Sequence, residues 1–589
     1  MRRFKIAGAW GRPGGGAIGN PAPPRFPLMA VKTCRFLTSG TVFPVSVAGA
    51  VCRKSGPIQH FGEIFRPLCL AFPPHLMMSD RSPAGEVPVL QVDSLRFGVA
   101  FALILAIVQR VIGLLRSILF CRILPEEQLG QWSLTWSYLM LLAPLAVLGL
   151  PGSFSRYVET YRRRGQLRTF LVRVTLVSLL ATGLFSFLLF ALAGPLAEWL
   201  YRDANQVPLV HVLAATLFVV VAFNFATSLM ESLRQVRLVT VMRMINGVGF
   251  ALLSLGLLLV WPGSIEAITL GFVLSCLIAL VPAIVYLSRN RSIIGTGCQP
   301  LAGSAMWARV APFALWLWTI NVVSNLYETA DRTMLLHLAP VSAAEAQILV
   351  GQYHSGRVLP LVLVGLAAML SGILLPYMTA HWERGDRGRV IRQMRWTLKL
   401  TALGFTAAGI AVLAFAPLLF SGVFAGKYNG GLAVLPLTLV YCIWYGLMTV
   451  GQDYLWCREQ GKWGCLVLGL GLGVNLMANV LLIPRFGLTG AVWATTVSTL
   501  TALIALLLVN ACFGCRPDRG IWLTAALPLV LVLPVTQATV ILVVVAWAGI
   551  HYGWLFDERE KQELVRTVEW FGQLTRSVRP GGRFRAGAQ

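Results

Sequence analysis

Apolar segments of about 20 residues recur along the chain from Phe97 onward, and this is the length that a helix needs to cross the hydrocarbon core of a membrane. Loops that contain charged residues, Gly or Pro separate them. The sequence predicts twelve spans, at residues 97–120, 132–150, 170–193, 208–230, 240–261, 265–288, 310–336, 347–376, 398–420, 432–456, 463–483 and 488–511. A last apolar stretch, 521–556, is too long for one upright helix and short for two.

Composition supports a membrane protein. Hydrophobic residues make up 57% of the chain and charged residues 12%, with a mean hydropathy of +0.72, which excludes an ordinary soluble globule. The sequence therefore predicts an all-α polytopic membrane protein with 12 to 14 transmembrane helices. A formal charge of +25 would favour nucleic-acid binding in a soluble protein. Here the basic residues lie in loops between spans, so we expect no nucleic-acid partner.

Residues 1–77 differ from the rest because they are rich in Gly, Pro and Arg, and Glu63 is their only acid. We expect a disordered basic extension. The start of the chain lacks the unbroken apolar core of a signal peptide. A transit peptide would share the scarcity of acids, but the density of Gly and Pro argues against an amphipathic helix. The favoured hypothesis is that the start was assigned too far upstream and that translation begins at Met77 or Met78.

Lys and Arg near the ends of spans remain on the cytoplasmic side of the membrane. The odd-numbered loops contain only Arg122, Arg202, Lys427 and Arg485, whereas the even-numbered loops hold the larger share. This bias predicts that the N terminus and the even loops are cytoplasmic. The tail after Phe556 carries seven more Lys and Arg. A cytoplasmic tail requires 521–556 to cross twice, with a turn near Thr536, which gives fourteen spans; thirteen spans with an external tail is the alternative.

Two stretches about two hundred residues apart echo each other, which indicates a duplicated helical bundle. In the first, Arg116 precedes the run Leu129-Gly130-Gln131-Trp132. In the second, Arg332 precedes the run Val350-Gly351-Gln352-Tyr353. In both, an apolar span then leads to Pro and a charged loop.

The run from Arg122 to Trp132 resembles the first hairpin of the polysaccharide-biosynthesis flippases, the O-antigen flippase family of the multidrug/oligosaccharidyl-lipid/polysaccharide exporter superfamily. Three further stretches are similar: Asp331-Arg332 with the Val350 run, Leu374-Leu375-Pro376, and Asn475 to Ala494. The likeness covers residues 95 to about 511. One departure is Leu124-Pro125, where the family more often has Leu-Gly-Pro.

The resemblance implies two six-helix lobes, related by an axis along the membrane normal, that face each other across a central cavity. An even number of spans per repeat gives both copies the same orientation. The expected organisation is the extension 1–77, an N-lobe at 95–290 (spans 1–6), a C-lobe at 305–511 (spans 7–12), a terminal helical pair at 521–556 and a cytoplasmic tail at 557–589.

Charged residues within spans are the functional candidates, because an ionisable group at mid-bilayer is costly unless it faces protein or water. Four arginines are the predicted substrate-binding residues of the cavity: Arg110, Arg116, Arg332 and Arg357. Three further groups are predicted structural or coupling charges: Glu328, Asp331 and His354. Guanidinium groups bind a pyrophosphate through two parallel hydrogen bonds, and the lipid-linked sugar diphosphates of this family carry that group.

Simpler roles compete with these assignments. Arg116 and Arg332 could extend to the outer headgroups. Asp331 is expected to pair with a neighbouring arginine as a structural ion pair. Asp453, near the cytoplasmic end of the tenth span, is expected to be solvated. Residues 557–574 could form an amphipathic helix on the inner membrane face.

Other motifs do not indicate chemistry. Gly469, Gly471 and Gly473 lie in an apolar span with no preceding strand, so they indicate close helix packing. Cys512 and Cys515 form a CxxC without the second pair of a zinc site. The sequence has no ATP-binding P-loop and no catalytic carboxylate pair. We therefore expect no enzyme, no metal site and no cofactor apart from a coupling ion, H⁺ or Na⁺.

The favoured function is a secondary transporter, a flippase that moves lipid-linked oligosaccharide across the bacterial cytoplasmic membrane for surface polysaccharides such as O-antigen lipopolysaccharide. Its partners would be a polyprenyl diphosphate sugar and membrane lipids, with a polysaccharide polymerase and glycosyltransferases as further candidates. The first alternative is a cation-coupled drug exporter of the same superfamily, whose cavity should hold unpaired carboxylates. The second is a membrane-embedded glycosyltransferase or polysaccharide ligase, which would need a large outer loop with catalytic acids.

Overall fold

The computed structural model describes residues 37–38, 41–42, 95–290, 301–556 and 560. The chain divides into two compact units, 1–32 and 33–589, and every described residue lies in the second. Of the extension 1–77, only a two-stranded antiparallel pair is described, β1 (Leu37–Thr38) with β2 (Thr41–Val42). The predictions for the rest of 1–77 and for the tail beyond Glu560 fall outside the described residues.

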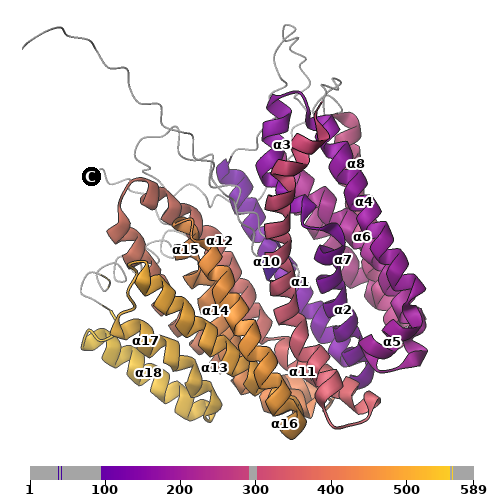
Figure 1. Cartoon of the computed structure of the whole chain (residues 1–589). Helices are drawn as coiled ribbons and strands as arrows, with labels where there is room; N and C mark the ends of the chain where they lie inside the picture. Colours follow the sequence, from indigo (N-terminus) through magenta and orange to yellow (C-terminus); the bar gives the residue numbers. More distant parts are fainter. Residues whose placement is uncertain (1–36, 39–40, 43–94, 291–300, 557–559, 561–589) are drawn as a thin grey trace, which may run out of the picture. The chain divides into compact units, whose positions relative to one another are not determined.

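Helices follow the predicted apolar segments in order, as an all-α membrane protein requires (Figure 1). The elements up to residue 290 are α1 (Leu95–Ile123), α2 (Glu126–Val147), η2 (Leu150–Ser153), α3 (Phe154–Arg163), α4 (Leu167–Ala191), α5 (Ala193–Tyr201), η3 (Ala204–Gln206), α6 (Val207–Ser232), α7 (Val236–Val260) and α8 (Ile265–Arg289). We call this set the N-lobe.

The second set, here called the C-lobe, contains α10 (Gly303–Leu338), α11 (Ala343–Arg357), α12 (Pro360–Glu383), α13 (Arg387–Leu418), η4 (Leu419–Val423), α14 (Asn429–Gly451), α15 (Asp453–Cys457) and α16 (Gly461–Cys512). The terminal pair is α17 (Arg519–Ala526) with η5 (Leu527–Val532), then α18 (Val535–His551). Within the described part, nine helices are long and apolar enough to cross a membrane, and a bent pair of helices is a tenth candidate.

The bent pair lies in the second span. α2 ends where Leu148 and Gly149 adopt left-handed backbone conformations, with φ of 53° and 67°, and the chain continues through η2 and α3 at an angle of 63° to α2. The eighth span is also interrupted. It was predicted as one segment, 347–376, but α11 ends at Arg357 and α12 begins at Pro360, whose fixed φ suits the first position of a helix.

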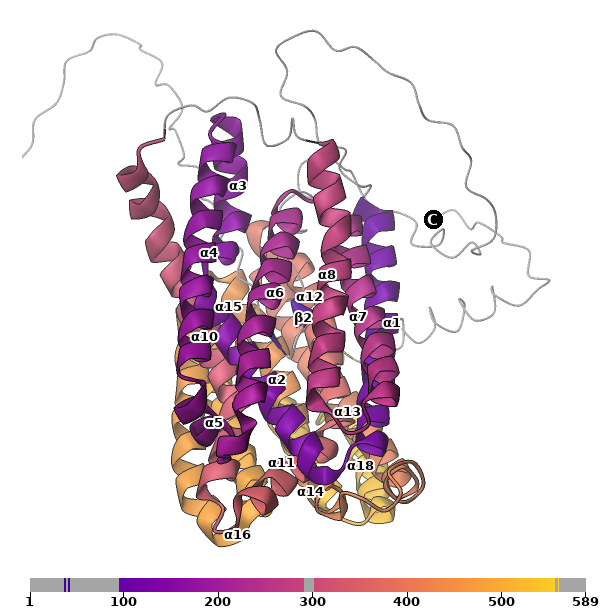
Figure 2. The ribbon, with the colours of Figure 1, turned by 90° about the vertical axis from the view of Figure 1, so that its right-hand side faces the viewer.

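Neighbouring helices of the N-lobe pack in the order α4, α6, α8, α7, α1, which Figure 2 shows from the side. Their outward faces are apolar and uncovered: on α4, Leu180, Leu184 and Phe187 are each more than 60% exposed. Such a face would be costly in water and is favourable against lipid tails. The helices are therefore built for contact with a membrane.

The terminal helices form a hairpin against α13, with the break at Leu533–Pro534, close to the turn predicted near Thr536 (Figure 1). The buried Lys399 of α13 forms ion pairs with Asp518, at the start of the hairpin, and with Glu560, beyond its end, at 2.7 and 2.9 Å. Both ends of the hairpin therefore lie on the same side of the protein. The cytoplasmic location of the tail stays a prediction.

Candidate functional site

A buried polar cluster in the C-lobe surrounds Asp331 of α10. One carboxylate oxygen accepts hydrogen bonds from the side-chain amides of Asn475 and Asn479, at 2.9 and 3.0 Å. The other accepts from the hydroxyls of Tyr353 and Thr495, each at 2.7 Å. Within the described residues no ion pair involves Asp331, so the expected pairing with a neighbouring arginine is wrong. Neutral donors stabilise this buried charge instead.

The arginine predicted nearby pairs with a different acid. Arg357, at the end of α11, donates from Nη2 to Glu328 of α10 at 3.0 Å. The side chain of Arg357 is 7% exposed and that of Glu328 is 24% exposed. The carboxylate therefore forms the more open side of this ion pair.

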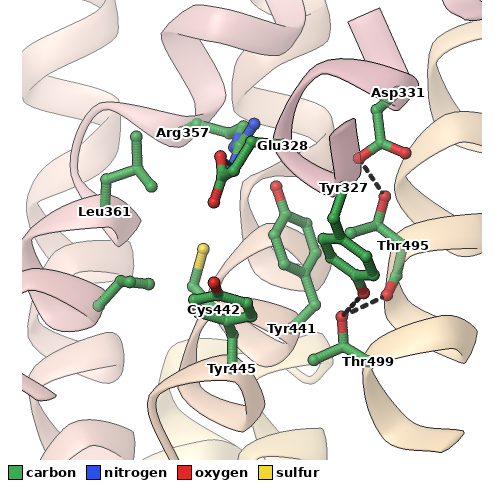
Figure 3. Close-up of a pocket in the computed structure, with 11 residues that line it drawn as sticks. Tyr327, Glu328, Asp331, Arg357, Leu361, Tyr441, Cys442, Tyr445, Thr495 and Thr499 are labelled. Atoms are coloured by element: carbon green, nitrogen blue, oxygen red, sulfur yellow. Dashed lines mark hydrogen bonds and ion pairs between the residues drawn. The ribbon is translucent and has the colours of Figure 1, made fainter. Parts of the chain in front are cut away.

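Glu328, Asp331 and Arg357 line one cavity of about 20 Å³, which Figure 3 shows together with three tyrosines. This volume accommodates about one water molecule. The remaining lining residues come from α10, α12, α14 and α16: Tyr327, Leu361, Val364, Tyr441, Cys442, Tyr445, Thr495 and Thr499. Tyr327 is fixed by hydrogen bonds to Ser498 and Thr499. The cavity is therefore aromatic on one side and charged on the other.

Two of the predicted residues connect the lobes. Arg332 donates from Nη1 to the hydroxyl of Ser137 on α2 at 2.7 Å, and His354 contacts the hydroxyl of Ser133 through Nδ1 at 3.1 Å. Arg332 is buried, which contradicts its extension to the outer headgroups. Both residues therefore couple the C-lobe to the helix that begins the broken second span.

The N-lobe contributes the other two arginines. The guanidinium of Arg116 lies 4.0 Å above the ring of Phe250, which stacks on Trp136. Such a cation–π contact stabilises a charge within an apolar region. Arg110 reaches the opposite lobe, because its Nη1 occupies the space beside Gly365 of α12 into which a Cβ would project.

The four arginines fall into two levels. At 1.5 Å per residue, Arg110 and Arg357 lie about 20 Å from the predicted outer ends of α1 and α11, with one residue from each lobe. Arg116 and Arg332 lie about 10 Å from the predicted outer ends of α1 and α10. The sequence prediction of comparable depths in both lobes agrees with these helix bounds. Only Arg357 lines the described cavity.

A second set of contacts joins the lobes where their helices end on the predicted outer side. Arg202 donates to the carbonyl oxygens of Leu336 and Val341, at the end of α10. Lys427 donates to those of Arg122 and Leu124, at the end of α1. We call Arg202, Lys427 and their acceptors the outer latch. In the sequence, the small number of basic residues in the odd-numbered loops indicated the orientation of the chain. It did not indicate that two of these residues connect the lobes.

Sequence reasoning missed several partners. Asn475 and Asn479 lie one helical turn apart in an apolar span, and that spacing is a readable signal of a buried polar face. The tyrosines of the site carry no such signal: Tyr353, which donates to Asp331, and the three that line the cavity, Tyr327, Tyr441 and Tyr445. Asp453 was expected to be solvated but is buried, and it accepts a hydrogen bond from Ser371 at 2.7 Å. That expectation is wrong because α15 continues directly from α14 into the packed helices.

Residues 95–382 match the sequence profile of a family described as polysaccharide biosynthesis protein. This stretch, slightly less than half of the chain, is similar to that family. The match confirms the resemblance predicted from the sequence and includes all seven predicted site residues. The comparison with curated proteins gives no match.

Solved membrane transporters share the fold. The match to a structure of the lipid II flippase MurJ in an inward closed conformation covers 77% of this chain and 99% of the MurJ chain, with a TM-score of 0.58 and 12% identity. A multidrug resistance MATE family transporter of the MOP superfamily covers 69% of this chain and 94% of its own, with a TM-score of 0.55 and 13% identity. A MATE transporter of Vibrio cholerae gives a TM-score of 0.51, with 13% identity over 71% of this chain and 97% of its own. The chain is thus a multi-pass membrane protein with the fold of transporters and flippases.

Proposed function

We propose that this protein is a flippase that moves a lipid-linked oligosaccharide from the inner to the outer leaflet of a bacterial cytoplasmic membrane. The family match supports a role in polysaccharide biosynthesis. The transporter fold supports alternating access without covalent chemistry. The substrate would be a polyprenyl diphosphate sugar, delivered by glycosyltransferases and consumed by a polymerase.

One observation carries the substrate assignment. Of the four arginines predicted to bind substrate, the two deeper ones, Arg110 and Arg357, come from opposite lobes at about the same depth, about 20 Å from the predicted outer end. A diphosphate carries oxygens on both phosphorus atoms, so two guanidinium groups can hold it at once. Arg357 is buried and Arg110 is half-buried, and a lipid diphosphate would bring anionic oxygens to both guanidinium groups.

The drug-exporter alternative fits less well. Such a cavity should hold unpaired carboxylates for a cation, whereas Glu328 is paired with Arg357 and Asp331 accepts four hydrogen bonds. The glycosyltransferase or ligase alternative needs a large outer loop, and the described outer connections, such as 202–206 and 339–342, are short. A coupling ion, H⁺ or Na⁺, stays part of the proposal, with Asp331 and Glu328 as the charges nearest the cavity.

The test is substitution of the deep arginines in cells that depend on the protein. Arg110→Ala or Arg357→Ala should cost about 1.5 to 3 kcal/mol in substrate binding, which is roughly 10- to 100-fold in affinity. Sugar-linked polyprenyl diphosphate should then accumulate on the cytoplasmic leaflet at normal protein level. Arg357→Lys should recover only part of the affinity that Arg357→Ala loses, because Lys keeps the charge but cannot donate two parallel hydrogen bonds. Arg485→Ala, which removes an exposed outer arginine, is the control and should have no effect.

Normal surface polysaccharide in the Arg110→Ala/Arg357→Ala double variant would overturn this assignment. Loss of export of a cationic dye, with unchanged surface polysaccharide, would favour the drug exporter.

A further inference from the structure

Arg357 uses only a small part of its capacity to donate hydrogen bonds in this structure. Its Nη2 donates to Glu328, whereas its Nε and Nη1 are buried and have no hydrogen-bond partner among the described residues. A guanidinium offers five N–H donors in a fixed planar arrangement, and buried donors of this kind are normally satisfied. Arg357 lines the C-lobe cavity, which now accommodates about one water molecule, so its unused donors point to an anionic ligand that binds when the cavity widens.

Glu328 is placed where such a ligand would bind. Its carboxylate contacts Arg357 from the more open side of the ion pair, with 24% of the side chain exposed. Carboxylate and phosphate oxygens bind a guanidinium with the same geometry. Glu328 therefore resembles the anionic group of a substrate, held in its place by the protein.

A displaced Glu328 has a second cation within reach. Arg332 follows it by four residues on α10, the spacing at which helical side chains meet. The Nε of Arg332 is buried and has no hydrogen-bond partner in the described part of the chain. Its Nη1 donates a hydrogen bond to the hydroxyl of Ser137 of the N-lobe. A carboxylate that moves to Arg332 would compete with this link between the lobes.

We propose that Glu328 is a placeholder anion that the substrate diphosphate displaces from Arg357, and that the released carboxylate turns to Arg332 and frees Ser137 of the other lobe. This inference rests on the proposed function and adds to it the step that joins substrate binding to movement of the lobes. The exchange leaves both guanidinium groups paired with an anion, because Arg357 binds the diphosphate and Arg332 binds Glu328. An empty transporter keeps its lobes linked, and a loaded one loosens them.

The first experiment measures binding of a long-chain polyprenyl diphosphate to the purified full chain in lipid nanodiscs. Glu328→Gln should bind it more tightly, because Arg357 no longer has to be vacated. If Glu328 leaves Arg357 free in about a tenth of the molecules, the gain is about 10-fold. The double variant Glu328→Gln/Arg357→Ala should bind as weakly as Arg357→Ala alone. Glu198→Gln removes an exposed acid at the outer end of α5 and should bind like the wild type.

The second experiment separates binding from movement. Spin labels at Ala204 and Ser421, exposed positions on the two lobes, report the outer separation of the lobes. The lipid should increase this separation in the wild type but much less in Glu328→Gln, which binds tightly yet lacks the carboxylate that turns to Arg332. Ser137→Ala should increase it without lipid. Glu328→Gln should therefore combine tighter binding with slower flipping.

If the wild type binds the lipid and Glu328→Gln binds it no more tightly, the exchange is overturned and the proposed function stands. Flipping by Glu328→Gln at the wild-type rate would also overturn it. No binding of polyprenyl diphosphate by the wild type would overturn the proposed function and the exchange together. Thermal melting of each variant with and without lipid shows whether a weak signal comes from unfolded protein, and Glu328→Asp, which keeps the charge on a shorter side chain, should bind with intermediate affinity.

Discussion

Gly130 of α2 and Gly351 of α11 face each other where the two lobes cross, and each backbone nitrogen lies 3.1 to 3.2 Å from the point where the other residue would carry a Cβ. The neighbouring contacts repeat with the same symmetry. Gln131 donates to the side chain of Gln347, and Gln352 donates to the side chain of Glu126, at 2.7 and 2.9 Å. These pairs are related by the sequence duplication, so the repeat axis passes between the two glycines.

Substitution of Gly130 by Ala should force the lobes apart on the outer side. The added methyl group would overlap the backbone carbonyl of Gln347, which cannot move away as a flexible side chain can. Overpacking of this kind costs about 1–3 kcal/mol. Hydrogen exchange of the amides at 126–131 and 343–352 should accelerate by about tenfold for each 1.4 kcal/mol lost. Gly183→Ala, where nothing lies within 4 Å of the new atom, should leave exchange unchanged.

The outer latch should hold the outer side closed. Arg202→Gln and Lys427→Gln each remove a charged donor to helix-terminal carbonyls of the opposite lobe, so the double variant should favour an open outer side. The distance between spin labels at Ala204 and Ser421 should grow by about 5 Å or more, the scale of rigid-body shifts in such transitions. Arg485→Gln also removes an exposed outer charge and should change nothing. An unchanged distance in the double variant would show that the latch does not control closure.

The apolar spans and the fold class could be predicted because hydropathy accumulates over a whole helix. The break between α11 and α12 was missed because Val358 and Leu359 are as apolar as their surroundings, although Pro360 is a sequence signal for a helix break. The echo of Gly130 and Gly351 was visible in the sequence, but their contact depends on the crossing of two helices. The donors to Asp331 are also distant in sequence: Asn475 is 144 residues away and Thr495 is 164 residues away. Pairing at such separations is decided by packing and leaves no local signal.

Lys399 should be essential for docking of the terminal hairpin. Lys399→Met leaves Asp518 and Glu560 without their shared cation, and breaking a buried pair in this way costs about 3–5 kcal/mol. Limited proteolysis should then cut within 519–556, and the melting temperature in detergent should fall. The triple variant Lys399→Met/Asp518→Asn/Glu560→Gln has no unpaired charge and should recover most of the loss. Failure of the triple variant to recover would mean that packing of Lys399, and not its charge, holds the hairpin.

Asp331 and Asp453 are both buried acids, and replacing each by Asn should change the stability of the protein in different directions. Asp331 accepts four hydrogen bonds, and Asn replaces one accepting oxygen by a donor, so Asp331→Asn should destabilise the protein by about 1–3 kcal/mol. Asp453 accepts from Ser371 only, and its second oxygen has no partner among the described residues. Replacing a buried carboxyl group that has so little hydrogen-bond support should be neutral or stabilising, within about 1 kcal/mol. Thermal melting of both variants in the same detergent measures the contrast, and an equal loss in Asp453→Asn would show that its carboxylate is held by further interactions.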